Sequence, residues 1–336
     1  MLVHEDISES IEYSTIRIDE WNQFFSVLPL FTYRKWIFRG QEDASWKLTT
    51  GLDRESNFPA NTQKDNCLLR NASFFDHFDF WAYERSRPKT HQEERNAIAA
   101  FMSYERSRFP SPHPYIDALV DMQHYGSKTR LLDFTWSILV ALFFAFEKQA
   151  NGKQRALFAI NYESICDGSK SIALFKDLAI PSSDPDDAEH CMEVANEELF
   201  GDRKKMVESL LAVAERNITD DSFERKDVFP VLAEGNNPRI SAQNGLFLMS
   251  ASFDPFEDNL ARAFGLEKNP LTESKLIRGD DIQMVTQAIE TGKFIKFVFD
   301  EKLERQAWNI LDHANISSRT MCPDRVGLAR SIRYDN

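Results

Sequence analysis

Two short polar segments contain most of the side chains whose types and spacing suggest chemistry. The longer segment, residues 123–135, reads Gln-His-Tyr-Gly-Ser-Lys-Thr-Arg-Leu-Leu-Asp-Phe-Thr and is followed by the strongly apolar run 138–146. The shorter segment, residues 38–41, reads Phe-Arg-Gly-Gln. Polar groups beside the start of a core element are costly to bury unless they form hydrogen bonds. We therefore expect the two segments to form one site together.

Arg39, His124 and Tyr125 each have a functional and a structural interpretation. The planar guanidinium of Arg39 matches phosphate or carboxylate, but it could equally form an internal salt bridge with Asp133. His124 and Tyr125 come just before Gly126, at the expected end of a helix. They could direct a ring nitrogen and a hydroxyl at a ligand, or a protonated His124 could stabilise the helix C-terminus.

The remaining polar groups of the longer segment are also open to two interpretations. Arg130 and Asp133 could pair with each other or with the backbone and so fix the loop. Thr129 and Thr135 could be helix caps or hydroxyls that face a ligand. The functional interpretation therefore depends on the whole group rather than on one residue.

Common catalytic and metal-binding patterns are absent from the sequence. It contains no G-x-x-x-x-G-K-[ST], G-x-G-x-x-G or G-x-S-x-G motif, and no histidine lies at a metal-ligand spacing from His124. We expect no metal site and reduced thiols, since no C-x-x-C pair occurs among Cys67, Cys166, Cys191 and Cys322. Paired carboxylates for glycoside hydrolysis stay open, because 53 acidic residues offer many candidates.

Length and composition predict a protein with a large core. The chain has 336 residues, of which 42% are hydrophobic and 27 are phenylalanine. The net charge of −13 argues against coating of duplex nucleic acid, although a local basic pocket for a nucleotide remains open. The start lacks a secretory pattern, and the longest apolar run is far shorter than the roughly 20 residues of a membrane span. We expect a cytoplasmic protein without membrane partners, and its oligomeric state is left open.

Hydrophobic periodicity and turn residues predict alternating helices and strands. Strands are expected at residues 36–40, 156–160, 228–232, 245–249 and 294–299. Helices are expected at residues 19–28, 93–108, 116–125, 206–214, 281–291 and 302–314, with a further buried helix that begins at Thr135 or Ser137 and ends near Gln149.

The absence of repeats and flexible linkers predicts one mixed body over residues 1–336. Its fold class is α+β, with a central, largely antiparallel sheet and helical insertions at about 55–115 and 184–225. Seven carboxylates crowd residues 184–198, and we interpret them as the solvated face of a helix rather than as a metal site.

The chain resembles the FRG family, named for its Phe-Arg-Gly motif. The resemblance lies in residues 36–41, 46, 48, 54, 123–126, 129–135, 141–145, 242–247, 322–324 and 327–329, and so spans about 35–330. Ser127 and Lys128 replace the usual apolar-proline pair, and Phe134 replaces the usual tryptophan, but the polar groups are kept. Such proteins occur mainly in bacteria and their viruses, so the resemblance implies a toxin or an antiphage defence effector.

A weaker similarity to ADP-ribosyltransferases of the R-S-E type implies that NAD is the substrate. In this similarity Arg39 contacts NAD, Thr135 supplies the motif hydroxyl, and His124 and Tyr125 line the nicotinamide pocket. Gln243 takes the third position, where these enzymes use a glutamate; Glu257 and Glu301 are alternatives that no spacing selects. The nucleotide contacts implied are Arg39, Gly40, Gln41, Thr129, Arg130 and Asp133.

Two other function classes stay open beside ADP-ribosyl transfer to a protein or nucleic acid. One is an NADase or a metal-dependent nuclease in which His124 or Asp133 acts as general base or metal ligand. The other is a non-catalytic module that binds a nucleotide or a protein through Arg39 and Arg130.

Overall fold

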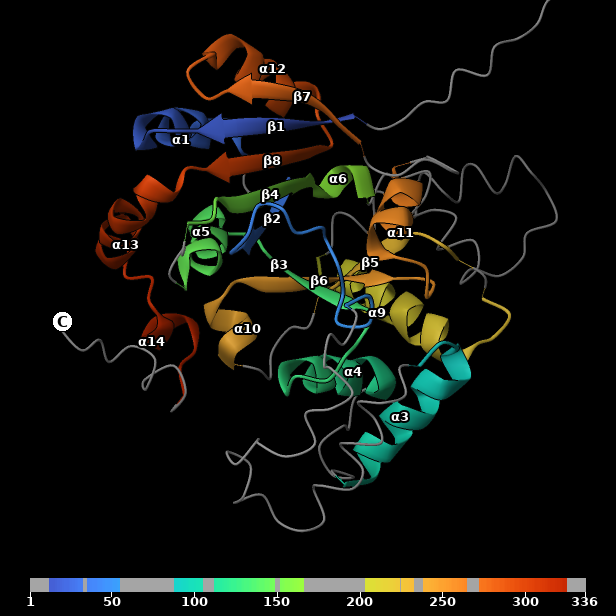
Figure 1. Ribbon diagram of the computed structural model, residues 1–336. Coiled ribbons are helices and arrows are strands. Elements are labelled where there is room, and N and C mark those ends of the chain that lie inside the picture. Colours follow the sequence, from blue (N-terminus) through green and yellow to red (C-terminus); the bar gives the residue numbers. More distant parts are fainter. Residues whose placement is uncertain are drawn as a thin grey trace, which may run out of the picture.

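A single mixed sheet organises the computed structural model of the protein (Figure 1). The structure describes residues 12–32, 35–54, 88–104, 112–148, 152–165, 203–223, 225–232, 238–264 and 272–324. Within them, eight strands lie in the order β5-β6-β3-β2-β4-β8-β1-β7. Their bounds are β1 Glu12–Ile18, β2 Trp36–Gln41, β3 Leu131–Thr135, β4 Arg155–Asn161, β5 Val228–Val231, β6 Gly245–Ser250, β7 Thr272–Arg278 and β8 Phe294–Phe299.

The strand pairing confirms the predicted α+β class with a largely antiparallel sheet. All neighbours from β5 to β8 pair antiparallel, whereas β1 runs parallel to both β7 and β8. The pairing of β2 with β3 is limited to Phe38 and Thr135, so the sheet opens beside this point.

Helices cover both faces of the sheet. Their bounds are α1 Trp21–Val27, η1 Leu28–Leu30, α3 His91–Tyr104, α4 Pro114–His124, α5 Ile138–Phe146, α6 Tyr162–Ile165, α9 Arg203–Thr219, α10 Pro238–Ala242, α11 Phe256–Ala263, α12 Ile282–Thr291, η3 Glu301–Leu303, α13 Glu304–His313 and α14 Ser318–Met321. Figure 1 shows α3, α4 and α9 at the β5–β6 end of the sheet, while α12 lies at the β7 end. No helix in the described ranges is long and apolar enough to cross a membrane.

The strands divide the core because successive side chains point to opposite faces. On β2, Trp36 and Phe38 join a cluster with α1, α5, α12 and α13, whereas Ile37 joins a second cluster with α6, α9 and α11. A third cluster lies between α3, α4 and α9 and the strands β5 and β6. The second and third clusters pack against the two faces of β3, which carries the last five residues of the longer polar segment.

Most predicted elements are present, with shifted ends. The expected C-terminal cap of α4 is confirmed, since Gly126 has φ +88° and Ser127 donates to the carbonyl of Met122. Ser137 rather than Thr135 caps α5, by accepting a hydrogen bond from the amide of Val140. Helix α1 ends at Val27, and Pro29 lies inside the 3-10 helix η1 that follows it.

Strand β3 and helices α6, α10, α11 and α14 were not among the expected elements, and neither were the strands β1 and β7. Both strands pair with segments remote in the chain, and their apolar residues alternate with polar ones over short stretches. The predicted insertions at about 55–115 and 184–225 fall partly outside the described residues, namely at 55–87, 105–111, 184–202 and 224. The single body over residues 1–336 stays a prediction.

Candidate functional site

A cleft of about 450 Å³ lies where β2 and β3 separate. Beyond the pair formed by Phe38 and Thr135, the Nη1 of Arg39 donates to the carbonyl oxygen of Asp133 over 2.7 Å. A side-chain hydrogen bond therefore joins the two strands beside the point where their backbones stop pairing. The cleft is lined by Phe38, Arg39, Gly40, Gln41, Glu42, Trp46, Arg54, Asp133, Phe134, Thr135, Phe144, Glu147, Lys148, Arg239, Gln243 and Cys322.

Helix α5 presses on β2 at Gly40 and so explains the Phe-Arg-Gly motif physically. A Cβ at Gly40 would lie 1.9 Å from the carbonyl oxygen of Ala141 and 2.5 Å from the amide nitrogen of Ala145. Both atoms belong to the helix backbone, so only glycine allows this approach. Phe38 is buried in the core, and Arg39 between them lines the cleft.

Only some of the hydrogen-bond donors of the Arg39 guanidinium have a partner in the protein. Its side chain is 14% exposed, its Nε is buried without a hydrogen-bond partner, and its Nη1 lies 3.7 Å from the Asp133 carboxylate. Burial lowers the pKa of Arg39, the Asp133 charge raises it, and the nearby charge of Arg54 lowers it further. The two interpretations of Arg39 thus overlap: it contacts Asp133 and still has a donor to offer.

Further charged groups line the cleft around Arg39. The positive ones are Arg54, Arg239 and Lys148, and the carboxylates are Glu42, Asp133 and Glu147. Two of the cations are paired, because Arg239 contacts Asp324 over 2.6 Å and Lys148 contacts Glu42 over 2.9 Å. The sequence prediction missed Arg239, and Arg54 entered it only through the family resemblance.

A chain of hydrogen bonds orients the carboxylate of Asp133. Buried Thr129 donates to Oε1 of Gln123 over 2.6 Å, and Nε2 of Gln123 donates to Oδ2 of Asp133 over 3.1 Å. The amide of Leu131 in turn donates to the Thr129 hydroxyl over 3.2 Å. Thr129, predicted as a nucleotide contact, therefore positions Gln123 and does not line the cleft. Gln123 itself was not among the predicted site residues.

Thr135 and Gln243 meet at the cleft although they are remote in the sequence. The Thr135 hydroxyl donates to the Gln243 carbonyl over 2.7 Å and accepts from the amide of Ser137 over 3.0 Å. Nε2 of Gln243 donates to the carbonyl of Met321 over 3.0 Å and so ties the cleft to α14. Much of the hydrogen-bonding capacity of this pair is thus used within the protein.

Gln41 contributes a buried acceptor to the same cleft. Its Nε2 donates to the carbonyl of Lys47 over 3.2 Å, whereas its Oε1 is buried without a hydrogen-bond partner. A buried amide oxygen without a partner is costly, so this position favours a donor supplied from the cleft.

His124 and Tyr125 do not line the cleft. Tyr125 is 59% exposed, and its ring contacts those of His124 and Phe101. Burial lowers the pKa of His124, the positive charge of Arg239 lowers it further, and nearby carboxylates raise it. The neutral imidazole is therefore favoured, which argues against the predicted stabilisation of the helix terminus by a protonated ring.

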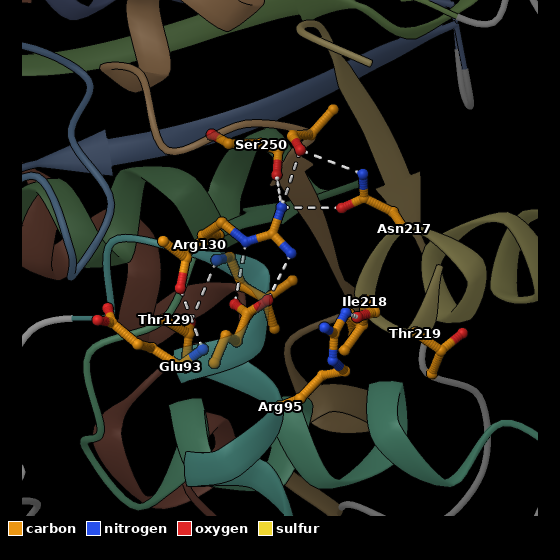
Figure 2. Close-up of polar contacts among 12 residues, drawn as sticks. Glu93, Arg95, Thr129, Arg130, Asn217, Ile218, Thr219 and Ser250 are labelled. Carbon is orange, nitrogen blue, oxygen red and sulfur yellow. Dashed lines mark hydrogen bonds and ion pairs between the residues drawn. The ribbon is translucent and has the colours of Figure 1, made fainter. Parts of the chain in front are cut away.

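Arg130 belongs to the scaffold rather than to the Arg39 cleft (Figure 2). Its Nε donates to Oε1 of Glu94 over 2.9 Å, and both side chains are almost fully buried. Its Nη1 donates to the Asn217 side chain over 2.8 Å and to the carbonyl of Ser250 over 2.6 Å. The expected contact with the nucleotide is thus replaced by an internal network, although Arg130 borders a separate cavity of about 310 Å³.

Glu257 and Glu301, the alternatives for the third position of the R-S-E motif, lie outside the Arg39 cleft. Glu257 accepts from the amide of Leu48 over 3.0 Å, and burial raises its pKa. Neither Glu257 nor Glu301 lines the cleft. In the part of the chain that the structure describes, no group of three or more His, Cys, Asp or Glu side chains could hold a metal ion.

Comparison with known proteins supports the Phe-Arg-Gly resemblance. The model of the FRG domain matches residues 34–154, which include β2, β3 and α5. The later features of the resemblance, beyond residue 154, lie outside this match. No curated protein and no solved structure matches the chain.

Proposed function

We propose that this chain, whose residues 34–154 carry an FRG domain, binds an NAD-type nucleotide in the Arg39 cleft and transfers ADP-ribose from it. The single observation that carries the proposal is the largely buried guanidinium of Arg39, which keeps a donor without a partner in a cleft that Arg54 also lines. The protein as a whole has a net charge of −13, and two guanidinium groups in one cleft suit an anion such as a phosphate.

The cleft has the size and chemistry that a nucleotide requires. Small-molecule sites measure about 300–1,000 Å³, and this cleft measures about 450 Å³. Arg39 and Arg54 offer charge-assisted hydrogen bonds to phosphate oxygens. The unpartnered Oε1 of Gln41 accepts from a ribose hydroxyl or from the amide of the leaving base.

The reaction breaks the bond between the ribose C1′ and the nicotinamide nitrogen. Nicotinamide leaves as a neutral base with the electron pair of that bond, and positive charge develops on the ribose. A hydroxyl or amine of the acceptor then bonds to C1′ and loses its proton to water. The protein contributes by positioning the ribose and by stabilising the positive charge.

Asp133 is the group that stabilises this developing charge. Its carboxylate lines the cleft, is 58% exposed and is held by Gln123. In this respect it takes the part of the glutamate that Gln243 cannot replace. The proposed setting is a bacterial conflict or defence system, which rests on where FRG proteins occur.

Titration of NAD by calorimetry tests binding, and release of free nicotinamide tests chemistry. Arg39→Lys keeps the charge but loses the planar fork, so we expect about a 10- to 150-fold weaker affinity for NAD. Asp133→Asn keeps binding but loses nicotinamide release. Arg278→Lys is the matched control, because Arg278 is exposed on the remote strand β7.

The outcomes separate the possible functions. If the wild type does not bind NAD, or if Arg39→Lys binds it as tightly as the wild type, the proposal is wrong. Binding without nicotinamide release assigns the chain to non-catalytic nucleotide-binding modules instead. Nicotinamide release without modification of any acceptor assigns it to NADases.

A further inference from the structure

Trp46 is an exposed aromatic side chain in the lining of the Arg39 cleft. Half of its surface is exposed, which is unusual for so large and mainly apolar a side chain. It is therefore no core residue, and its exposed surface lies where a ligand in the cleft can reach it.

The backbone that carries Trp46 is held in a hydrogen-bonded turn. Oδ1 of Asp43 accepts from the amide of Ser45 over 2.9 Å and from its hydroxyl over 2.6 Å. The amide of Trp46 donates to the carbonyl of Asp43 over 3.2 Å, and that of Ala44 donates to the carbonyl of Gln154 over 2.8 Å. The indole is thus presented on a rigid support, which lowers the entropy cost of binding.

A lysine strengthens this support. Nζ of Lys153 lies 2.7 Å from Oδ2 of Asp43 and 5.9 Å from the centre of the Trp46 ring. The bond from Lys153, together with those from Ser45, lowers the pKa of Asp43 to about 2. The turn therefore keeps its charged carboxylate throughout the neutral range.

We infer that Trp46 stacks on the planar heterocycle of the ligand whose phosphates Arg39 binds. Guanidinium groups and an open indole in one cleft match the two halves of a nucleotide, since phosphate takes the charge and every base has a π-face. This inference rests on the proposed function, and it adds that a heterocyclic base is needed for tight binding.

Calorimetric titration of NAD into three variants tests the stacking. Trp46→Ala removes the ring, and we expect the affinity for NAD to fall about 5- to 150-fold. Trp46→Phe keeps an aromatic face, so its affinity should stay within about threefold of the wild type. Tyr104→Ala is the control, because Tyr104 is an exposed aromatic residue that does not line the cleft.

The results distinguish failure of the stacking from failure of the proposed function. If the wild type binds NAD, Arg39→Lys loses it and Trp46→Ala keeps it, then only the stacking is wrong. The stacking is also wrong if Trp46→Phe loses as much affinity as Trp46→Ala. If the wild type does not bind NAD, both proposals fall.

Discussion

Replacing Glu94 with glutamine tests the scaffold that holds the polar segment of β3. Glu94 and Arg130 form a buried pair, with side chains 3% and 2% exposed. The pair joins α3 to the start of β3, five residues from Thr135 at its other end. Glutamine keeps the shape of the side chain, so the variant removes the charge and leaves no cavity.

The loss of stability expected for Glu94→Gln depends on what else surrounds the guanidinium of Arg130. Breaking a buried ion pair by removing one partner costs about 3–5 kcal/mol, because a charge is left uncompensated. Three oxygens would still surround the Nη1 of Arg130, from Asn217, Ser250 and Ala251. We therefore expect a loss near the lower end, about 3 kcal/mol in the free energy of unfolding.

Urea denaturation followed by circular dichroism measures this loss of unfolding free energy. We expect the midpoint to shift while the m-value stays the same as in the wild type. Asp221→Asn is the matched control, because Asp221 is 72% exposed and pairs with Arg95 on the same helix α3. An exposed pair contributes little to stability and is screened by salt. The Glu94→Gln loss should therefore persist in 1 M salt, whereas that of Asp221→Asn should disappear.

The reasoning is refuted if Glu94→Gln costs no more than Asp221→Asn, or if salt removes its effect. Either result would mean that water reaches Arg130 and that the pair is not part of the dry core. The cleft would then need another explanation for the fixed position of Asp133.

Three further substitutions test other parts of the structure. Gly40→Ala should cost about 3 kcal/mol or more in unfolding free energy, because its Cβ would overlap the α5 backbone; Gly126→Ala, with open space but φ +88°, should cost only about 1–2 kcal/mol. Burial raises the pKa of Glu215, which accepts from the amides of Tyr115 and Ile116. The folded protein therefore binds the proton of the Glu215 carboxyl more tightly than the unfolded chain does. The protonated carboxyl stabilises the fold fully below the ordinary pKa of a glutamate, and this stabilisation is lost as the pH rises through the raised pKa of the folded state. The stability of the wild type relative to Glu215→Gln should fall as the pH rises above the ordinary pKa of a glutamate, measured in parallel denaturation series, and a rising difference would contradict this.

The sequence predicts the elements that carry their own pattern. Short apolar runs identify β2 and β6, and a longer continuous apolar run identifies α5. Strands β1 and β7 are missed because their sequences, Glu-Tyr-Ser-Thr-Ile-Arg-Ile and Thr-Glu-Ser-Lys-Leu-Ile-Arg, mix apolar and charged residues. Their strand conformation depends on partners hundreds of residues away, and local propensity does not contain that information.

Some residues of the candidate site could also be identified from the sequence, and others could not. Arg39, Asp133 and Thr135, singled out for their polar character beside core elements, line one cleft together with Gln243, which was proposed only through the similarity to ADP-ribosyltransferases. Their role as a functional site stays a prediction. Arg130 has the same character, yet its partner Glu94 comes from a helix 36 residues earlier. Residue type shows that a guanidinium needs an anion, but only the packing of α3 decides whether that anion is a ligand or a side chain.

The position of β1 has a consequence for how the chain acquires its shape. Strand β1 lies between β7 and β8. Its residue Glu12 pairs with Thr272 of β7, and its residue Ser14 pairs with Ile295 of β8. During synthesis β1 must wait for roughly 280 later residues before it can be inserted, and contacts so remote slow the final step of folding. Until then the earliest part of the chain is exposed to proteases and to aggregation.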